Sequence, residues 1–360
     1  MGFNGIKNES AESRKRVTDY RNKQASPKAM IVDGRYVAGW FESFDGRINV
    51  QDAGAGAGRL SSWLHVTFDT PTHFVGAHLA DLSIAGHAAV LIVDKAKEKA
   101  WDRSKKSILW KKRMRIDEHF SRFEELRSGS MIAMTPEGGV ELDVKVAGLR
   151  LTAKAVPAFC APFVQTTRQP GAKGSLQWWG NLQLVEGTAI KDGKRIDLPA
   201  GVLGAYDRTV GHRASIQNWN WLSASGMATS LKSGEEVPFS MQMSKDGPRA
   251  RPPVDGHKTT TWIGDSTMLK LPPITFSYER VGANNETGPW SIKSKDSEKS
   301  GMELTFVPRF KRREMGAIPL VYQSDFNQYY GHLSGDFWTP DGRYRISDVF
   351  ALTEDSYLRF

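Results

Sequence analysis

The sequence contains a single cysteine, Cys160, among its 360 residues. One thiol excludes an internal disulfide and any metal site built from cysteine pairs. The neighbours of Cys160 are apolar, with Ala158-Phe159 before it and Ala161-Pro162 after it. We therefore expect a buried, unreactive thiol rather than a catalytic nucleophile.

Long apolar stretches are also missing. No part of the chain approaches the roughly 18 to 20 consecutive apolar residues that a membrane-spanning helix needs. Residues 1–28 form a polar, basic tail without the apolar core of a signal peptide. These features predict a cytoplasmic protein. Because 360 residues exceed one ordinary hydrophobic core, we expect two domains.

Acidic residues are fewer than basic ones, which gives a net charge of +9 and a pI near 9.4. The excess lies in short runs at Arg14–Arg16, Lys105–Arg115 and Lys311–Arg313. No zinc finger, aromatic RNA-binding sequence or helix-turn-helix pattern accompanies them. We interpret the runs as solvated basic faces and do not expect a nucleic-acid partner. Contact with an anionic ligand or a membrane surface stays open.

Helical periodicity is scarce. The clearest case is Lys111–Arg127, where Ile116, Phe120 and Phe123 have the spacing of one face of a short helix. Elsewhere the apolar residues alternate with polar ones, as in Val140–Val146 and Met302–Phe306. Six Asp-Gly dipeptides, which favour tight hairpin turns, begin at Asp33, Asp45, Asp192, Asp246, Asp255 and Asp341. The pattern predicts an all-β protein of sandwiches or barrels.

A turn at Leu198–Gly201 separates a hairpin from a new, aromatic-rich segment. We therefore predict three parts: a tail at residues 1–28, an N-terminal lobe at 29–200 and a C-terminal lobe at 201–360.

Signatures of metal and nucleotide sites are absent. His73, His78 and His87 fall close together, but their spacing matches no metal-binding motif. The glycine-alternating segment Gly54–Gly58 precedes a predicted strand instead of a helix, so it does not suit a phosphate. No serine has the context of a catalytic triad. We expect neither a metal nor an organic cofactor.

The segment Tyr206–Gly226 has the most unusual composition in the chain. On a strand, Trp219 and Trp221 share one face, and Asn218 and Asn220 share the other. Indole rings beside amides suit the wall of a pocket that holds an apolar ligand and orients one polar group. A tryptophan-rich core with amides bonded to loops explains the same residues equally well.

Motifs along the chain resemble a bacterial family called domain of unknown function 2804. They are Gly39–Phe41, Ala80–Val90, Asp207–Gly226, Tyr330–Gly335 and Leu352–Asp355. Together they cover roughly residues 36 to 360. The family is similar to a wider calycin group of carotenoid 1,2-hydratases (hydroxyneurosporene synthases), AttH-type proteins and fungal lipocalin-like cyclases.

The resemblance implies two consecutive lipocalin-like β-barrel lobes with a ligand pocket at or between them. It also implies chemistry without a cofactor, in which an apolar polyene is hydrated or cyclised. Part of the site in that group is an Asp-His-Asn-Trp-Gly block. Here Asn220 and Trp221 match its Asn-Trp, while Trp219 stands in place of the histidine and Asn218 in place of the aspartate.

Alkene chemistry of this kind needs a proton donor with a raised pKa and walls that tolerate positive charge. The catalytic candidates are Asp207, His212, Glu354 and Asp355. The ligand-binding candidates are Asp81, Trp178, Trp179, Tyr206, Asn218, Trp219, Asn220, Trp221, Tyr330 and His332. For each carboxylate, an ion pair with an arginine is the structural alternative.

We predict a cofactor-independent lyase or isomerase, hydratase- or cyclase-like, that acts on a hydrophobic terpenoid, polyene, steroid or aromatic compound. A non-catalytic carrier of such a molecule is the second hypothesis. A scaffold or nucleic-acid-associated protein that uses the basic charge is the third.

Overall fold

The structure is a computed structural model. It describes residues 24–41, 43–55, 57–83, 85–108, 113–158, 162–169, 173–247, 258–264, 267–281, 286–294, 299–318 and 322–359. Cys160 and most of the N-terminal tail therefore lie outside the described residues. Among the described residues, no helix has the length and apolar character needed to cross a membrane.

The described chain is built almost wholly from strands, with one 3₁₀ turn, η1, at Val50–Asp52. The strands are β1 (Ile31–Val32), β2 (Arg35–Tyr36), β3 (Gly39–Phe41), β4 (Arg59–Asp69), β5 (His73–Asp81), β6 (Ala85–Asp94), β7 (Lys99–Ile108), β8 (Met114–Ile116), β9 (Arg122–Glu125), β10 (Ser130–Met134), β11 (Val140–Val146), β12 (Leu149–Pro157), β13 (Phe163–Arg168), β14 (Gly174–Lys191), β15 (Lys194–Leu198), β16 (Leu203–Arg213), β17 (Ile216–Ser230), β18 (Glu236–Asp246), β19 (Lys258–Ile263), β20 (Thr267–Lys270), β21 (Ile274–Ser277), β22 (Arg280–Val281), β23 (Glu286–Thr287), β24 (Trp290–Ser294), β25 (Gly301–Ile318), β26 (Tyr322–Thr339) and β27 (Gly342–Arg359).

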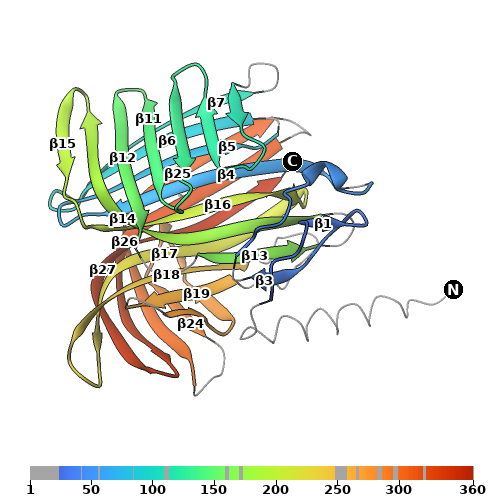
Figure 1. Ribbon diagram of the computed structural model, residues 1–360. Helices are drawn as coiled ribbons and strands as arrows, with labels where there is room; N and C mark the ends of the chain where they lie inside the picture. The colour runs from blue at the N-terminus through green and yellow to red at the C-terminus, as the bar shows by residue number, and fades with distance from the viewer. Residues whose placement is uncertain are drawn as a thin grey trace.

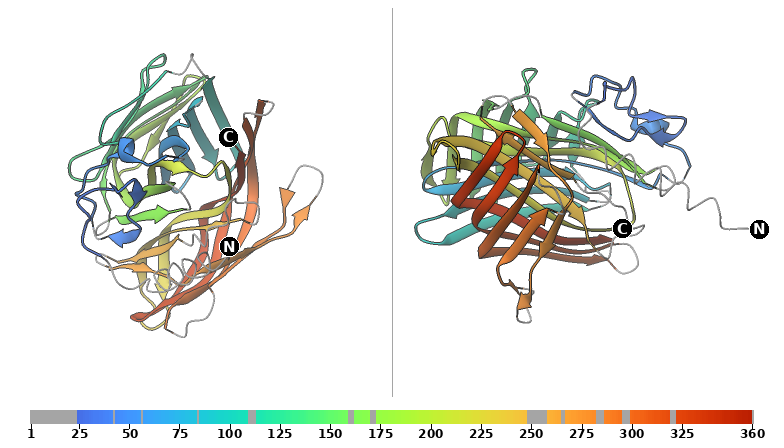
Figure 2. Two further views of the ribbon diagram at one scale, coloured as in Figure 1. Left: turned by 90° about the vertical axis from the view of Figure 1, so that its right-hand side faces the viewer. Right: turned by 90° about the horizontal axis from the view of Figure 1, so that it is seen from below.

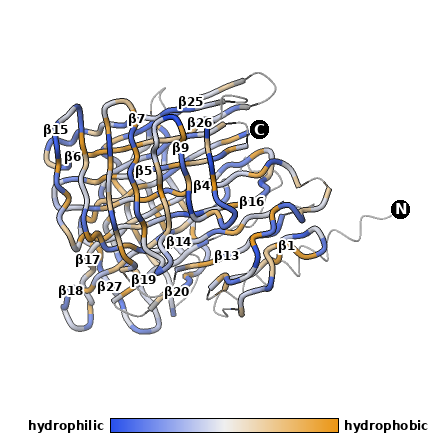
Figure 3. Tube along the Cα trace, turned by 45° about the horizontal axis from the view of Figure 1, so that its top comes forward, coloured by the Kyte–Doolittle hydropathy of each residue, from blue (hydrophilic) through white to orange (hydrophobic). Residues whose placement is uncertain are grey.

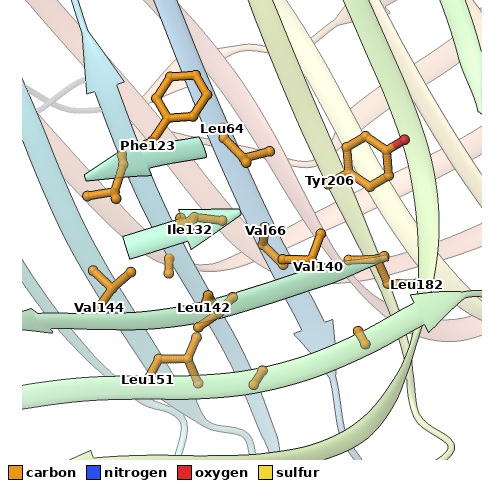
Figure 4. Packing of buried hydrophobic residues seen from close by; sticks show 14 of the residues in the cluster. Leu64, Val66, Phe123, Ile132, Val140, Leu142, Val144, Leu151, Leu182 and Tyr206 are labelled. Carbon is orange, nitrogen blue, oxygen red and sulfur yellow. The ribbon is translucent and has the colours of Figure 1, made fainter. Parts of the chain in front are cut away.

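The first large sheet runs in the order β7-β6-β5-β4-β16-β14-β12-β11-β10-β9-β8, with β3, β13 and β15 attached beside β14. It curls until β9–β12 lie across β4–β6, as the upper half of Figure 1 shows. The alternation of Val140–Val146 puts every second residue of β11 inside this curl. Figure 4 shows Val140, Leu142 and Val144 packed near Leu64 and Val66, so a continuous apolar core fills the lobe.

The second large sheet has the order β20-β19-β18-β17-β27-β26-β25-β24-β21 and curls in the same manner (Figures 1 and 2). Its three longest strands, β25, β26 and β27, span 18 residues each and pair along most of their length. Met302, Leu304 and Phe306 of β25 point into its core together with Trp290 and Tyr329. The predicted alternation in this segment is therefore confirmed.

A third apolar cluster lies between the two curled sheets. It takes Phe74, Leu91, Val93 and Trp179 from the first sheet and Trp221, Trp262, Tyr330 and Leu352 from the second. The stripes of orange and blue along the strands in Figure 3 reflect this arrangement. Strands such as β6 are buried on both faces, because one face meets the lobe core and the other meets the opposite sheet.

The two-lobed, all-β architecture predicted from the sequence is confirmed. The change of sheet falls at residues 214–215, since β16 still pairs with β4 and β14 of the first sheet. The turn at Leu198–Gly201 only ends the β14–β15 hairpin. Positive φ angles at Asp33-Gly34 (50° and 71°) and Asp192-Gly193 (47° and 80°) confirm hairpin turns at two of the six Asp-Gly pairs. The β26–β27 hairpin turns at a third, Asp341-Gly342, where Thr339 pairs with Gly342.

The predicted short helix at Lys111–Arg127 is wrong. Ile116 ends β8, Phe123 lies in β9, and Phe120 occupies the turn between them with a φ of 53°. The three apolar residues match helical spacing because a tight turn also brings them to one side. Tertiary packing of Phe123 into the first core decides the outcome.

Candidate functional site

The opposed faces of the two sheets carry both aromatic and ionisable side chains. In the first sheet, strand register aligns Trp179, Asp207, His65 and His78 in one row. In the second sheet, it aligns Trp221, Glu354, Gln328 and Arg312. The rings of His65 and Trp221 meet with their centroids 5.8 Å apart, which joins the two rows. We call these eight residues the inter-sheet site.

Glu354 is the most unusual ionisable group in the site. Its side chain is buried, and it accepts hydrogen bonds from Nε1 of Trp219 at 2.8 Å and from Nε2 of Gln328 at 2.7 Å. Burial raises the pKa of Glu354 to about 7, and the negative charge of Asp207 adds to the effect. The two hydrogen bonds act in the opposite sense, since they stabilise the carboxylate. This acid can therefore give and take a proton near neutral pH.

Gln328 connects Glu354 to a buried arginine. Its Oε1 accepts from Nη1 of Arg312 at 2.7 Å and from the hydroxyl of Tyr330 at 2.8 Å. Two donors on one side of the amide fix its orientation, so its NH₂ group faces Glu354. Removing any member of this series of hydrogen bonds would change the contacts of Glu354.

Arg312 is itself held by two carboxylates. Its Nε donates to Oδ2 of Asp102 at 2.7 Å, and its Nη2 donates to Glu314. Glu314 also pairs with Lys106 at 2.7 Å and lies 3.3 Å from Nε2 of His87. Burial opposes ionisation of Glu314, but His87 and Arg312 hold its pKa well below the usual range. The network joins β6 and β7 of the first sheet to β25 of the second.

Three histidines extend across β4, β5 and β6. The ring centroids of His65 and His78 are 5.8 Å apart, and those of His78 and His87 are 5.2 Å apart. Burial lowers the pKa of His65 to about 4, and the positive charge of Arg312 contributes. Burial, followed by the charges of His87 and His65, also holds the pKa of His78 well below 6.5. His65 and His78 are therefore neutral imidazoles at pH 7.

A narrow crevice of about 10 Å³ lies within the site. The first sheet lines it with the apolar residues Phe74, Gly76, Ala77, Ala89 and Leu91 and the polar residues His65, His78 and Asp102, and the second sheet lines it with Arg312, Gln328 and Tyr330. This volume suits about one water molecule. Among the described residues, no three His, Cys, Asp or Glu side chains are grouped so that they could hold a metal ion.

Asp207 lies on the first-sheet side, opposite His65 in the strand register. It accepts hydrogen bonds from Nε1 of Trp63 at 3.1 Å, Nε2 of Gln177 at 3.1 Å and the hydroxyl of Thr209 at 2.9 Å. Neutral donors thus hold the carboxylate in place.

Two cations lie near Asp207. Burial lowers the pKa of Lys258 to about 8, helped by the charge of Arg213, and burial lowers the pKa of Arg213 to about 10. The guanidinium of Arg213 stands 4.5 Å from the Trp63 ring and 6.0 Å from the Trp219 ring. Arg213 is half-buried and lies at the more exposed side of the site.

Residues 180–360 match the model of the family described as domain of unknown function DUF2804. The chain belongs to this family. No curated protein matches the DUF2804 chain by sequence. Among solved structures it is similar to an AttH protein from Nitrosomonas europaea, with 14% identity and a TM-score of 0.52 over 86% of this chain and 96% of that one. It is also similar to kievitone hydratase from Nectria haematococca, with 13% identity and a TM-score of 0.49 over 83% of this chain and 88% of that one.

At this identity, the likeness to the AttH protein shows the fold alone. It agrees with the AttH-type, calycin-like architecture that the motifs of the DUF2804 chain predict.

Several of the predicted site residues meet between the sheets. Glu354, Asp207, Trp221 and Trp179 belong to the inter-sheet site, and Trp219 and Tyr330 bond to its members. Trp179 stacks on Phe163 with ring centroids 5.3 Å apart. Trp219 and Trp221 share one face of β17, as the sequence predicts.

The predicted amides and the second acid point the other way. Asp355 faces the interior of the second lobe, where it is buried and pairs with Arg280. Asn220 donates to the hydroxyl of Tyr278 at 3.0 Å on that same side. Asn218 donates to the backbone carbonyl of Ser356 at 2.8 Å. Glu354 and Asp355 therefore point to opposite faces of β27.

The remaining predicted residues lie elsewhere. His212 bonds to the hydroxyl of Tyr36 through Nδ1 at 2.8 Å, away from the row that contains Asp207. Tyr206 and Trp178 face the core of the first lobe, where burial raises the pKa of Tyr206 to about 12. Asp81 accepts from the backbone of Ser83 at the end of β5. His332 lies farther along the face of β26 that carries Gln328 and Tyr330, where its ring centroid is 5.5 Å from that of Phe350 and its Nδ1 is 2.9 Å from Asp348.

The sequence analysis missed Arg312, Gln328, Asp102 and His65. Arg312 belongs to the run Lys311–Arg313, which we interpreted as a solvated face, yet its side chain is only 8% exposed. Alternation along β25 turns the middle residue inward. No local signal distinguishes Gln328 or Asp102, because their roles depend on partners far away in the sequence.

Proposed function

We propose that the chain is a cofactor-independent lyase or isomerase for an apolar small molecule, with Glu354 as the group that transfers the proton. The observation that carries the proposal is the buried Glu354 carboxyl, whose pKa of about 7 leaves it about half protonated at neutral pH. Few other positions in a protein provide such an acid, and this one lies between two lobes, where ligand sites are common.

The surroundings of Glu354 suit alkene or carbocation chemistry. Trp219 donates to its carboxylate, and Trp221 lies directly opposite it on the next strand. Indole faces attract positive charge, so they would stabilise a cation formed when the acid protonates a double bond. Neutral His65 and His78 across the interface can accept the proton released in the second half of the reaction.

Ligand binding in this proposal requires movement. The crevice of about 10 Å³ is far smaller than a typical small-molecule pocket of roughly 300 Å³ or more. Trp219 is half-buried at the outer side of the site, next to Phe326 with ring centroids 6.3 Å apart. Rotation of this aromatic pair would open a path to Glu354.

The test compares Glu354→Gln with the parent protein. Native mass spectrometry of the purified chain first identifies retained apolar ligands, and related alkenes and alcohols are then screened for turnover. Glu354→Gln should keep ligand binding and lose turnover by about a hundredfold or more, because it keeps the shape but not the transferable proton.

Exposed Glu141 on β11 provides a matched control, and Glu141→Gln should behave as the parent. Full turnover in a folded Glu354→Gln protein would contradict the proposal. Ligand binding without turnover in the parent would instead indicate a carrier.

A further inference from the structure

Two buried polar atoms of the crevice have no partner among the described residues. They are Nε2 of His78 and Oδ1 of Asp102. Both residues line the crevice: His78 lies on β5, and Asp102 lies on the edge strand β7. A buried polar atom without a hydrogen bond is costly, so such atoms commonly bond to an ordered water or a ligand group.

The chemistry of the two atoms is defined by their other contacts. The second oxygen of Asp102, Oδ2, is occupied by Nε of Arg312 at 2.7 Å, which leaves Oδ1 free to accept. A neutral imidazole has one ring nitrogen that accepts and one that donates, and Nε2 accepts when Nδ1 carries the proton. The crevice then presents two hydrogen-bond acceptors to one small molecule.

We propose that His78 and Asp102 bind one water molecule, or the hydroxyl group of a product, and that this water is a reactant of the enzyme. The inference rests on the proposed function for its chemistry, and it assigns the reaction as hydration and dehydration instead of isomerisation. The crevice volume of about 10 Å³ suits one water, which needs two to four polar partners.

The arrangement orients the water for attack. A water that donates one hydrogen to Asp102 and the other to His78 directs its lone pairs away from both. The apolar side chains of Phe74, Ala89 and Leu91 line the crevice on the same sheet face as His78 and Asp102. An alkene carbon would lie against them once the crevice widens. His78 is held neutral by burial and by the positive charges near it, so it can act as the base.

The step balances in atoms and electrons. The carboxyl proton of Glu354 passes to one alkene carbon, and the π electrons form the new C–H bond. The water oxygen supplies the electron pair of the new C–O bond to the adjacent carbon, and the released proton goes to Nε2 of His78. Transfer of that proton to solvent, with reprotonation of Glu354 from solvent, restores the enzyme. Dehydration is the reverse.

Gln328 lies between the two reacting groups, the Glu354 carboxyl and the proposed water. It lines the crevice and also donates to Glu354, so the acid and the water lie on either side of its amide. The proposal places the double bond beside this amide.

A crystal structure of the full chain that shows ordered solvent tests the site without any substrate. We expect one water within about 2.6–3.2 Å of both Nε2 of His78 and Oδ1 of Asp102. Direct bonding of either atom to another protein group, or a dry crevice, would overturn the inference.

Turnover experiments test the role. We expect label from H₂¹⁸O in the alcohol product, and at least a hundredfold loss of kcat in both Asp102→Asn and His78→Phe with KM changed less than threefold. His73→Gln is the matched control on the same strand, at a residue outside the crevice wall, and should stay within twofold of the parent.

Turnover without ¹⁸O incorporation, or full kcat in a folded His78→Phe protein, would reject the reactive water while leaving Glu354 as the acid. Loss of kcat in the His78 and Asp102 variants together with full turnover in Glu354→Gln would reject the acid and keep the water site.

Discussion

The indole N–H of Trp219 donates a 2.8 Å hydrogen bond to Oε2 of Glu354 across the β17–β27 pair. In the related calycin motif a histidine stands at the position of Trp219. The bond stabilises the carboxylate, while burial stabilises the neutral acid, and the pKa of about 7 results from the balance.

Replacing Trp219 by Phe should raise the pKa of Glu354 further above 7. The variant keeps an aromatic ring but loses the donor, so the charged form loses one of its two hydrogen bonds. A pH titration of ¹³C-labelled glutamate carboxyls by NMR measures the shift. Trp101→Phe, at a ring that packs against the first core from β7, should leave the pKa of Glu354 unchanged. An unchanged or lower pKa in Trp219→Phe would show that the bond does not form in solution.

Glu354 should make the protein less stable as the pH rises. Its pKa is about 7 in the folded chain and near 4.5 when unperturbed, so the folded state binds more protons between these values. The free energy of unfolding therefore falls as the pH increases through this window. Glu354→Gln lacks this titration and should gain about 3 kcal/mol relative to the parent between about pH 4.5 and pH 8. Urea unfolding at both ends of the window measures the difference, and Glu141→Gln should show none.

His65 should have the opposite effect at acid pH. Burial lowers its pKa from 6.5 to about 4, so between these values the unfolded chain binds a proton that the folded chain does not. The free energy of unfolding then decreases as the pH falls from about 6.5 to 4. His65→Gln should lessen this acid-side loss by up to about 3 kcal/mol, again measured by urea unfolding. His119→Gln, at a side chain that is 75% exposed, should follow the parent. Equal acid sensitivity of His65→Gln and the parent would mean that His65 is solvated or repositioned in solution.

Arg312 and Arg313 should differ sharply in their contribution to stability. Arg312 is buried between Asp102 and Glu314, so Arg312→Met leaves two carboxylates without their shared cation and should cost about 3–5 kcal/mol. Arg313 forms a partly exposed pair with Asp325, and Arg313→Met should cost about 1 kcal/mol or less. Denaturant unfolding of both variants makes the comparison. Combining Arg312→Met with Glu314→Gln and Asp102→Asn should recover part of the loss, since no carboxylate then lacks its counterion.

These two arginines also show what the sequence can and cannot predict. Period-two alternation correctly predicts which residues of Val140–Val146 and Met302–Phe306 are buried, because apolar residues identify the inner face. In the run Lys311–Arg313 all three residues are cationic, so the pattern does not reveal that the middle one turns inward. Its partner Asp102 lies 210 positions away, and only the packing of β7 against β25 brings them together.

The same reasoning applies to the acids. Alternation alone places Glu354 and Asp355 on opposite faces, and Trp219 with Trp221 on one face, which the structure matches. Strand register is a long-range property, so the sequence could not place Gln328 opposite Glu354 or His65 opposite Asp207. The buried acid could be named as a candidate, but the reason for its raised pKa could not.

Asp207 and Glu354 should be coupled electrostatically across the two sheets. Burial is the main cause of the raised pKa of Glu354, and the negative charge of Asp207 raises it further. Asp207→Asn keeps the size of the side chain and an oxygen that can accept from Trp63 or Thr209, but it removes the charge. The pKa of Glu354 should therefore fall toward, without reaching, its usual value near 4.5. NMR titration of the labelled carboxyls in the variant measures the change, with Asp197→Asn at an exposed position of β15 as the control.

Turnover then separates two roles for Asp207. If Asp207 only tunes Glu354, the pH profile of kcat/KM shifts to lower pH and its maximum stays within about tenfold of the parent. If Asp207 transfers the proton itself, the maximum falls by about a hundredfold or more at every pH, and the assignment of the acid to Glu354 would have to be abandoned.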